Sequence, residues 1–268
     1  MTQVKVLIVG YGFVGKAVET SLIGGREEKA ANFEIQVLDT GLGLQPTPEF
    51  LKVIDAVFIC VPSSGAEDGA CNDSIVQQYV ELFAMQKAIT VIRSSIPPSS
   101  VQKMVEINPA VIYMPEFLRE SSWKCDALHP EHLIIGTNVY DSFEALRNVF
   151  RKSALRNLEN MRMVDPVQAS LFKYAVNTFL ATKVVFFHEL NKWMEGAGHG
   201  DHWDGLKEML QKDERVGKSH LKAPGAHGYG FAGTCFPKDT KAFVAESVGE
   251  LSLLADAIKC NTRLRSSV

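Results

Sequence analysis

Residues 229–239 read Tyr-Gly-Phe-Ala-Gly-Thr-Cys-Phe-Pro-Lys-Asp and contain the residue types best suited to covalent chemistry. Cys235 closes a glycine-rich stretch, and Pro237 is typical of the first turn of a helix. A thiol at a helix N-terminus, beside the cation of Lys238, has a lowered pKa, which favours the nucleophilic thiolate. Cys235 is therefore a candidate nucleophile. The alternative is a small buried cysteine that carries no chemistry.

Two polar residues interrupt a long apolar stretch that has a helical pattern. Lys173 and Asn177 are four residues apart, so a helix places them on one face. A cation and an amide aimed at one point stabilise the negative oxygen that develops in carbonyl chemistry. A hydrogen-bond pair between helices explains the same spacing equally well.

Carboxylates follow an apolar run at residues 115–120, which read Pro-Glu-Phe-Leu-Arg-Glu. Ligands of open α/β sheets bind beyond the carboxyl ends of the strands, which makes Glu116 and Glu120 candidate bases. Carboxylates in loops are more often simply solvated, and that alternative stays open.

The sequence Gly-Tyr-Gly-Phe-Val-Gly at residues 10–15 fits the pattern G-x-G-x-x-G between a predicted strand and a predicted helix. Gly10 permits a tight turn, Gly12 lets the backbone approach a pyrophosphate, and Gly15 lets the helix pack close to the strand. In this context the motif, with Phe13 and Val14 between the glycines, predicts dinucleotide binding at a helix N-terminus. The alternative is a glycine-rich turn without a ligand.

Asp39 ends the second predicted strand, where a carboxylate binds the adenosine ribose hydroxyls of a dinucleotide. Thr40 and Gly41 follow, and no adjacent arginine is present to receive a 2′-phosphate. The expected cofactor is therefore NAD rather than NADP.

The elements that must position these residues alternate between strand and helix over the first part of the chain. Strands are expected at 4–9, 35–39, 56–61, 89–93, 111–114 and 132–136, with helices at 13–23, 74–87, after Pro98 and at 140–152. This alternation predicts the α/β class, with a Rossmann-like, doubly wound parallel sheet covered by helices on both faces. Residues 1–164 form the predicted cofactor-binding domain.

The second predicted domain, residues 165–268, is all-helical. Its main element is a helix at 166–194 that begins with Pro166 and is apolar nearly all round; shorter helices are expected at 203–211, 237–248 and 250–260. A helix that is apolar on every face must be buried on every face, and a partner subunit is one way to achieve this. The sequence therefore predicts a homodimer through this helix.

Composition excludes several classes of protein. The chain has 268 residues, 46% of them hydrophobic, with 28 Lys and Arg against 31 Asp and Glu and a net charge of −3. This is typical of an ordinary globular protein and gives no reason to expect a nucleic acid partner. No apolar run reaches the roughly 18 residues that a membrane span needs, so no membrane association is expected.

Cysteine and histidine spacing adds two expectations. Five scattered cysteines fit a reducing compartment better than a disulfide framework, so we expect a cytoplasmic protein. The pairs His129/His132 and His199/His202 have no third and fourth ligand at a zinc spacing, so no metal site is expected.

Together these patterns resemble the UDP-glucose/GDP-mannose 6-dehydrogenase family. The segments that carry the resemblance occur in the family's order and span nearly the whole chain. They are residues 10–15, Val61-Pro62-Ser63-Ser64, Arg93-Ser94-Ser95-Ile96-Pro97, residues 115–120, Lys173-Tyr174-Ala175-Val176-Asn177, Arg215-Val216-Gly217 and residues 230–239. The Cys-Phe-Pro-Lys-Asp and Pro-Glu-Phe-Leu pieces are specific, whereas the dinucleotide glycines alone are not.

The resemblance implies that a sugar C6 alcohol is oxidised to a carboxylate by two NAD. Cys235 would attack the aldehyde to form a thiohemiacetal, which a second oxidation turns into a thioester. Lys173 and Asn177 would steady the oxyanion. Asp239 would help to activate water, and Glu116 would be the base in thioester hydrolysis.

The resemblance also assigns residues around these groups. Glu120 and Ser95 would lie near the reaction, and NAD would contact the segment Val61, Pro62 and Ser63 as well as Ser95. Arg215 corresponds to an arginine that reaches the substrate of a neighbouring subunit. The long helix corresponds to the family's dimer core.

Family members usually carry a further C-terminal Rossmann-like domain that holds the nucleotide half of the substrate. The sequence ends at Val268 without it, so we expect weak substrate affinity, because binding of remote substrate parts supports orientation at the reacting carbon. The cysteine loop also departs from the usual pattern at Ala232, and it is extended around His227.

Two other functions remain open from the sequence. A β-hydroxyacid dehydrogenase shares the dinucleotide domain, the long helix and a Lys-x-x-x-Asn pair, needs no cysteine, and makes one NADH per substrate. A non-catalytic NAD-binding module fits the missing domain. The presence of Cys235 argues against the first, and the retention of Cys235, Lys173, Asn177, Glu116 and Asp239 together argues against the second.

Overall fold

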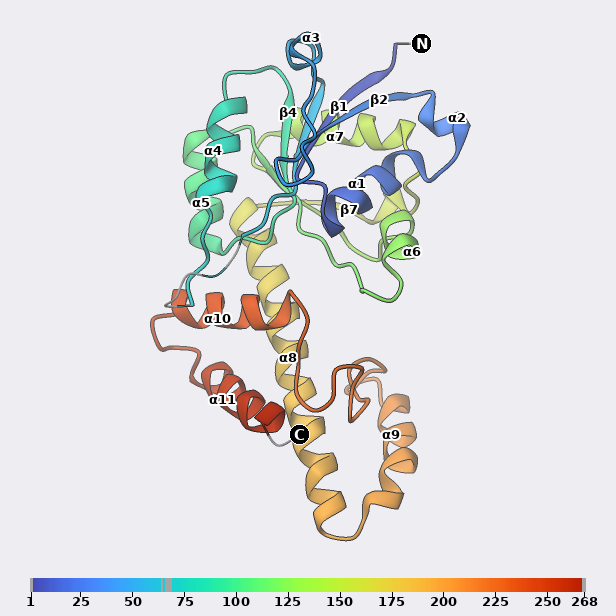
Figure 1. Ribbon diagram of the computed structural model, residues 1–268, viewed down its shortest axis with the longest axis vertical. Helices are drawn as coiled ribbons and strands as arrows, with labels where there is room; N and C mark the ends of the chain where they lie inside the picture. Colours follow the sequence, from blue (N-terminus) through green and yellow to red (C-terminus); the bar gives the residue numbers. More distant parts are fainter. Residues whose placement is uncertain (1, 64, 66–68, 267–268) are drawn as a thin grey trace. The chain divides into compact units, whose positions relative to one another are not determined.

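The computed structural model describes residues 2–63, 65 and 69–266, so Ser64 lies outside the described residues (Figure 1). The chain divides into two compact units. The first unit comprises Met1–Ser64 and Asn72–Lys173, and the second comprises Gly65–Cys71 and Tyr174–Val268. This division falls within a long helix, after Lys173; the domain boundary after residue 164 stays a prediction.

The first unit is built on a seven-stranded sheet with the order β2-β1-β3-β4-β5-β6-β7. The strands are β1 (Val4–Val9), β2 (Phe33–Leu38), β3 (Ala56–Ile59), β4 (Ile89–Ile92), β5 (Ile112–Tyr113), β6 (Leu133–Gly136) and β7 (Met161–Val164). The strands β1 to β5 are parallel. Because β1 lies between β2 and β3, the strand order reverses there, and ligands of such sheets bind at the carboxyl ends of the strands at this switch point.

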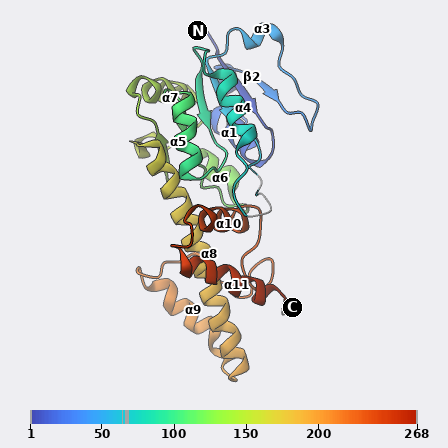
Figure 2. The ribbon, with the colours of Figure 1, turned by 90° about the vertical axis from the view of Figure 1, so that its left-hand side faces the viewer.

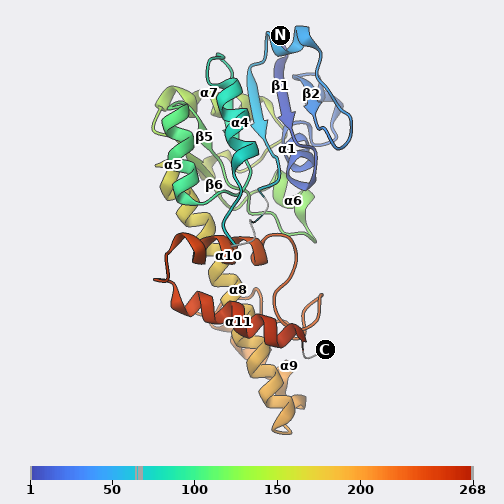
Figure 3. The same ribbon diagram turned by 60° about the vertical axis from the view of Figure 1, so that its left-hand side comes forward.

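Helices cover both faces of this sheet, as Figure 3 shows. They are α1 (Phe13–Ile23), α4 (Ser74–Phe83), α5 (Pro98–Ile107), α6 (Trp123–Leu128) and α7 (Tyr140–Lys152), with short helices α2 (Glu27–Ala30) and α3 (Pro48–Leu51). One face carries α4 and α5, while α1 and α7 pack on the other (Figures 1 and 3). The core under α1 and α7 joins Val18 and Phe150 to strand residues such as Ile8 and Phe58. The predicted α/β class with a Rossmann-like sheet is confirmed.

Part of the sheet differs from the prediction of a wholly parallel arrangement. The strand β6 pairs antiparallel with β5, and β7 pairs parallel with β6, so the last two strands run opposite to the first five. The strand β7 was not predicted, because two of its four residues, Arg162 and Met163, are exposed and it has no apolar run. The short helices α2, α3 and α6 were not predicted either.

The described residues of the second unit form helices without a strand. Its main element is α8 (Pro166–Gly196), 31 residues long, which begins in the first unit; α9 (Trp203–Lys212), α10 (Phe236–Glu246) and α11 (Ser252–Ser266) follow. Asp165 caps α8 by accepting hydrogen bonds from the N–H groups of Val167 and Gln168. Figure 2 shows α9 beside the C-terminal part of α8, and Figure 3 shows α10 and α11 side by side.

Two apolar clusters fix the later helices and the loop before α10. In one, Phe187 and Met194 of α8 pack with Trp203 of α9 and with Leu221 and Ala223 of the loop. In the other, α8 residues Ala181, Val184 and Val185 pack with Phe231 of the loop and Leu264 of α11. Within the part of the chain that the structure describes, no helix has both the length and the apolar character needed to cross a bilayer.

The long helix is not buried on every face of this chain. Phe179, Phe186 and Trp193 are 64%, 61% and 63% exposed, and they follow one another at intervals of seven residues. Two turns of a helix span about seven residues, so these three rings form one line, called here the α8 stripe.

Candidate active site

The glycines after β1 have three different surroundings at the switch point. Gly10 has a φ of +86°, and a Cβ on it would lie 2.7 Å from the carbonyl oxygen of Cys60, directly after β3. A Cβ on Gly15 would overlap the carbonyl oxygen of Gly10, so α1 packs directly on the turn. A Cβ on Gly12 would meet no atom of the described chain within 4 Å. The turn therefore combines the tight bend, open approach and close helix packing that a pyrophosphate site needs.

Asp39 joins the end of β2 to this turn. Its Oδ2 accepts a hydrogen bond of 2.6 Å from the N–H of Tyr11, and its Oδ1 accepts one of 3.0 Å from the N–H of Leu42. These two hydrogen bonds, that from Tyr11 above all, lower the pKa of Asp39 below its ordinary value. The carboxylate is therefore ionised at neutral pH and lies beside the turn, where ribose hydroxyls would need an acceptor.

The loops after β3 and β4 are tied together at the same edge of the sheet. Ser63 Oγ donates to the carbonyl oxygen of Ser95 at 2.6 Å, and Ser94 Oγ donates to that of Val61 at 2.6 Å. The predicted cofactor residues Val61, Pro62, Ser63 and Ser95 therefore share the edge at which β1 and β2 end. Ser63 is buried, whereas Pro62 is exposed.

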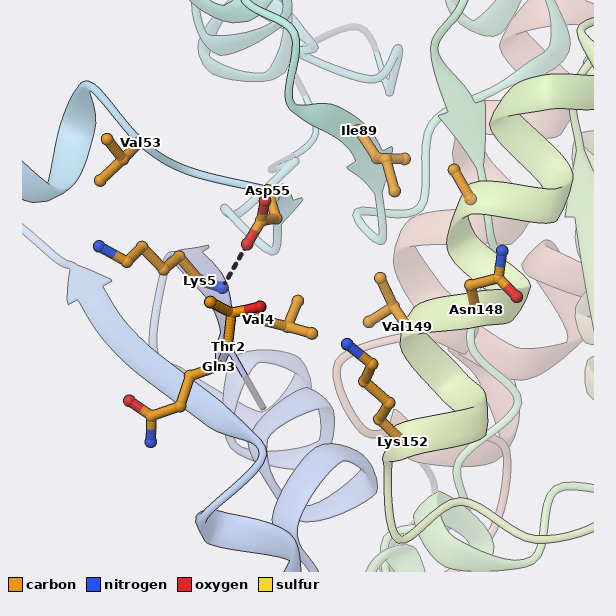
Figure 4. Close-up of a pocket in the computed structure, with 11 residues that line it drawn as sticks. Thr2, Gln3, Val4, Lys5, Val53, Asp55, Ile89, Asn148, Val149 and Lys152 are labelled. Atoms are coloured by element: carbon orange, nitrogen blue, oxygen red, sulfur yellow. Dashed lines mark hydrogen bonds between the residues drawn. The ribbon is translucent and has the colours of Figure 1, made fainter.

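A cavity of about 450 Å³ in the first unit lies at the opposite edge of the sheet. Its lining includes Val4 and Lys5 of β1, Asp55 before β3, and Ile89 of β4, together with Lys152 of α7 (Figure 4). These are the amino ends of parallel strands. In Figure 4 the carboxylate of Asp55 accepts a hydrogen bond from the main-chain N–H of Lys5. This cavity is thus separate from the candidate cofactor edge.

Lys173 and Glu116 form a buried ion pair within the first unit. Lys173 Nζ lies 3.1 Å from Glu116 Oε1 and also donates to the main-chain oxygen of Glu116. The ammonium group lies 5.1 Å from the centre of the Phe117 ring. The segment after β5 therefore wraps one cation with a carboxylate, a carbonyl and an aromatic face, all of which stabilise positive charge.

The ionisation of Glu116 is decided by two opposing effects. Burial raises the pKa of Glu116, but the charge of Lys173, together with hydrogen bonds from the Leu118 N–H and from Lys173, outweighs it. The net result is a pKa below the ordinary value of 4.5. Glu116 is therefore a carboxylate at neutral pH and has the charge state of a base.

Arg93 supports this segment and was not assigned a role from the sequence. Its Nη1 donates to the carbonyl oxygens of Met114 at 2.7 Å and Pro115 at 3.3 Å, so the guanidinium holds the backbone that leads into Glu116. Its charge adds to the lowering of the Glu116 pKa. Glu120, by contrast, is exposed on the following turn, while Arg119 beside it pairs with Asp126.

Cys235 of the second unit is the N-cap residue of α10, one position before Phe236. The helix begins at Phe236, one residue before the predicted start, with Pro237 in the first turn. The thiol is partly exposed, and Thr234 Oγ1 lies 3.7 Å from Sγ. Cys235 thus has the helix N-terminus expected of an activated thiol.

Asp239 lies one turn further along α10 and is fully buried. Asn177 Nδ2 donates to its Oδ2 at 2.6 Å, and Lys238 Nζ lies 2.6 Å from its Oδ1. The cation expected beside the thiol therefore pairs with Asp239. A buried carboxylate held by an amide and an ammonium group has both oxygens satisfied.

The structure accordingly groups the predicted residues in three sets. The first is the cofactor set at one sheet edge, with Gly10, Gly12, Phe13, Val14, Gly15, Asp39 and the loops after β3 and β4. The second is the pair Lys173 and Glu116, and the third is Asn177 with Asp239 near Cys235. Lys173 and Asn177 are one turn apart on α8 but have different carboxylate partners.

Other predicted groups lie outside these sets. Arg215 is exposed, and Asp213 accepts its hydrogen bonds at 2.9 Å and 2.6 Å. Among the described residues no three or more metal-ligating side chains are grouped in a way that would hold an ion.

Sequence reasoning missed two polar groups that shape the loop before Cys235. His188 of α8 and Asn261 of α11 are buried and hydrogen-bond to the backbone of Gly230 and Phe231. The available signal was the one used for Lys173 and Asn177, a polar residue in an apolar helix, and it applies equally to His188.

Two models of one protein family match the chain. The model of the "UDP-glucose/GDP-mannose dehydrogenase family, NAD binding domain" matches residues 35–154, and that of the family's central domain matches residues 167–263. A UDP-glucose 6-dehydrogenase of Rickettsia bellii is 32% identical over 203 residues, which is 72% of this chain and 45% of the relative. The chain spans about half the length of the curated relatives it matches.

Solved structures share the fold. A UDP-glucose dehydrogenase from Pyrobaculum islandicum matches with a TM-score of 0.78 at 23% identity, over 98% of this chain and 68% of that one. A 3-hydroxyisobutyrate dehydrogenase from Mycobacterium tuberculosis matches with a TM-score of 0.66 at 13% identity, over 99% of this chain and 94% of that one. At these identities the likeness concerns the fold alone.

Substitution of two glycines should separate cofactor binding from folding. We expect Gly12→Ala to leave stability unchanged but to weaken NAD binding about tenfold or more, because its Cβ enters the open space above the turn. Gly15→Ala should lower the free energy of unfolding by about 2 kcal/mol, because its Cβ overlaps Gly10. Calorimetric titration and urea denaturation measure the two effects; unchanged NAD affinity of Gly12→Ala would contradict the assignment.

Removal of the Glu116 charge should destabilise the protein in a pH-dependent way. At neutral pH we expect Glu116→Gln to lower the free energy of unfolding by about 3 kcal/mol, because it leaves Lys173 buried without a counter-charge. The folded-state pKa of Glu116 lies below 4.5, so its contribution is complete above 4.5 and is lost as the pH falls through the lowered value.

The difference between wild type and Glu116→Gln in urea denaturation should therefore narrow as the solution is acidified below pH 4.5. The control is Glu120→Gln, an exposed carboxylate in the same segment, which should match wild type at every pH. A constant difference at all pH values would rule out the ion pair as its cause.

Proposed function

Because the chain belongs to the UDP-glucose/GDP-mannose dehydrogenase family, we propose that it oxidises the C6 alcohol of a nucleotide sugar to a carboxylate with two NAD. The observation that carries this proposal is Cys235 at the N-terminus of α10, followed one turn later by the buried Asp239 with Asn177. A dehydrogenase that stops after one hydride transfer has no use for such a thiol.

The turn at residues 10–15 and the loops after β3 and β4 would hold NAD. The open space above Gly12 suits the pyrophosphate, and the ionised Asp39 suits the ribose hydroxyls. Phe13 is partly exposed beside Trp123 and adds apolar surface at the same edge. When bound, NAD accepts one hydride in each of the two oxidations.

Cys235 would carry the sugar between the two oxidations. Its thiolate attacks the C6 aldehyde and forms a carbon–sulfur bond, which gives a thiohemiacetal. Lys173 and Asn177 would stabilise the negative oxygen while the hydride leaves and a thioester forms. Water then adds to the thioester, the carbon–sulfur bond breaks, and the carboxylate leaves with the thiolate restored.

The carboxylates would handle the protons of these steps. Glu116 is ionised at neutral pH and so is able to take a proton from the attacking water. Asp239 would help to activate water from its pair with Asn177, with Ser95 and Glu120 near the reaction. Arg215, exposed on the surface, would reach the substrate of a neighbouring subunit.

A second candidate is a single hydride transfer from a β-hydroxyacid, with Lys173 as the acid–base group. The spacing of Lys173 and Asn177, one turn apart on α8, favours it, because that superfamily uses a Lys-x-x-x-Asn pair. A third is a non-catalytic NAD-binding module. A screen of UDP-sugars, GDP-sugars and β-hydroxyacids, with the NADH formed per substrate counted, separates the three. Two NADH per sugar indicate the nucleotide-sugar dehydrogenase, one NADH with a hydroxyacid only indicates the second candidate, and no NADH indicates the third.

The compartment we propose is the cytoplasm, because five cysteines scattered along the sequence fit a reducing compartment better than a disulfide framework.

We further propose that two copies of the chain pair through the α8 stripe. The stripe consists of three aromatic rings at seven-residue intervals, a spacing that lets one helix line up against another. A second copy supplies the same line of rings, so a two-fold pairing buries both stripes at once.

Replacement of Cys235 should abolish the second oxidation. We expect Cys235→Ser to lower turnover with a nucleotide sugar about a thousandfold, because a serine is a poorer nucleophile and its ester hydrolyses slowly, while NAD affinity stays unchanged. Iodoacetamide at neutral pH should label Cys235 before the other cysteines, and peptide mass spectrometry measures the order of labelling. The control is Cys125→Ser, an exposed cysteine on α6; full activity of Cys235→Ser in the two-NADH assay would exclude the covalent mechanism.

A charge on the α8 stripe should separate the two copies. Sedimentation equilibrium should give a dimer for wild type and a monomer for Phe186→Asp, since a carboxylate cannot be buried among aromatic rings without a partner. Met85→Asp changes an apolar residue that is 95% exposed in the first unit and should remain a dimer. A monomeric wild type would overturn the proposal.

A further inference from the structure

His188 of α8 lies beneath the loop that leads to Cys235 and bonds to it with both ring nitrogens. Its Nδ1 accepts a hydrogen bond of 2.7 Å from the N–H of Gly230, and its Nε2 lies 2.8 Å from the carbonyl oxygen of Lys222. The side chain is 1% exposed. Between these contacts the chain makes a tight turn, closed by two hydrogen bonds between Gly225 and Gly228. We call residues 222–230 the hairpin.

Only one form of the imidazole satisfies both contacts. The Gly230 N–H needs a lone pair on Nδ1, so the proton of the neutral ring must be on Nε2, where it is donated to Lys222. The doubly protonated ring has an N–H on both nitrogens and would bring two donors together at Gly230. The hairpin therefore fits the neutral ring and not the cation.

We propose that His188 is a positioning residue, whose neutral ring holds the hairpin closed and whose protonation releases the segment that carries Cys235. Its effect on activity rests on the proposed function of Cys235, but the hydrogen-bonded closure itself does not. All groups involved belong to the second unit.

A short, tightly packed segment connects the hairpin to Cys235, so a movement of the hairpin also moves Cys235. Gly230 has a φ of +81°, and a Cβ there would lie 2.5 Å from Asn261 Oδ1, so the backbone is tightly packed at this point. Asn261 then holds Phe231 by accepting from its N–H at 2.6 Å and donating to its carbonyl oxygen at 3.2 Å. A shift at Gly230 thus disturbs the clamp on Phe231, four residues before Cys235.

Release of the hairpin does not require the unit to unfold. Leu221 and Ala223 remain in the apolar cluster with Phe187 of α8, so the base of the hairpin has a second attachment. Tyr229 forms a third, because its hydroxyl group donates to Asn191 Oδ1 at 2.6 Å and lies 2.9 Å from Glu195 Oε1. The expected motion is local.

Charged and titratable groups occur near His188 on α8 and on the loop. On α8 these are Lys183, Glu189, Lys192 and Glu195, and on the loop they are His220, Lys222, His227 and Tyr229, whose ring meets His188 edge-on. Burial lowers the pKa of His188 below its ordinary value of 6.5, against the smaller effect of the Lys222 hydrogen bond.

The sign of the pH effect follows from these two states. A ring released into water protonates near the ordinary value of 6.5, whereas the closed hairpin resists protonation until lower pH. Below 6.5 the open state is therefore favoured by up to tenfold for each pH unit, until the lowered pKa is reached. Above 6.5 the opening equilibrium is independent of His188.

Three substitutions at His188 separate the two contacts. His188→Asn keeps an acceptor, Oδ1, where Nδ1 lies, so it retains the Gly230 bond and does not titrate. His188→Gln places an amide donor nearer to Lys222 and loses the acceptor at Gly230. His188→Leu loses both. His227→Asn is the matched control, because His227 is an exposed histidine within the hairpin itself.

Amide hydrogen exchange at Gly230 tests the closure without any substrate. We expect the wild-type protection factor to fall about tenfold per pH unit below 6.5. His188→Asn should keep its protection constant over that range, His188→Leu should show low protection at every pH, and His227→Asn should behave as wild type. Protection that falls equally in wild type and His188→Asn would overturn the proposal, as would high protection in His188→Leu.

Alkylation of Cys235 then tests the link to the thiol. We compare the iodoacetamide reaction rate of wild type with that of His188→Asn as a ratio, because the effect of thiol ionisation is common to both rates and cancels. This ratio should depend on pH only below pH 6.5. If the enzyme is active, the same ratio of kcat should fall on the acid side while KM stays constant. A pH-dependent exchange pattern in a protein that oxidises no sugar would refute the dehydrogenase and leave the closure standing; a flat ratio in an active enzyme would refute the closure alone.

Discussion

The constraint on which the rest of the structure depends is the burial of polar side chains along α8. Lys173, Asn177, His188 and Asn191 are all buried in α8 among large apolar residues, and an unpaired polar group there is costly. Each finds a partner outside the helix: the Glu116 carboxylate, the Asp239 carboxylate, the hairpin backbone and the Tyr229 hydroxyl. These contacts tie the segment after β5, the first turn of α10 and the hairpin to α8.

The candidate residues are positioned in different ways at the sheet edge and in the helical unit. At the cofactor edge backbone contacts position the candidate residues. Gly10 fits against Cys60 because it has no Cβ, and Asp39 accepts hydrogen bonds from backbone N–H groups. In the second unit side-chain contacts position them: Lys238 forms an ion pair with Asp239, and His188 accepts a hydrogen bond from Gly230. A position where the backbone must bend sharply or pack closely tolerates few residues besides glycine, so it is recognisable from glycine spacing. Contacts between distant side chains leave no such regular pattern in the sequence.

This difference explains how much the sequence predicted. The α/β class, the strands β1 to β6, the helices α1, α4, α5 and α7, and the start of α10 to within one residue of Pro237 follow from periodicity and backbone rules. The antiparallel β6 and β7 do not, because pairing direction depends on the connection and β7 is half exposed. The partners of Lys173 and Asn177 lie 57 and 62 residues away in the sequence, so residue type indicated the polar groups but not which carboxylate each would meet.

The composition of α8 illustrates the limit most clearly, because one apolar helix serves three different surroundings. Ala181, Val184 and Val185 face Phe231 and Leu264, whereas Phe187 and Met194 face α9 and the hairpin. The third side carries Phe179, Phe186 and Trp193 and stays exposed. An amphipathic helix would show which side meets water, but here each of the three sides carries large apolar residues, so the periodicity is weak and the aromatic spacing is the clearer signal. The proposed pairing of two copies through the α8 stripe would cover this third side, because each copy would supply the same line of rings.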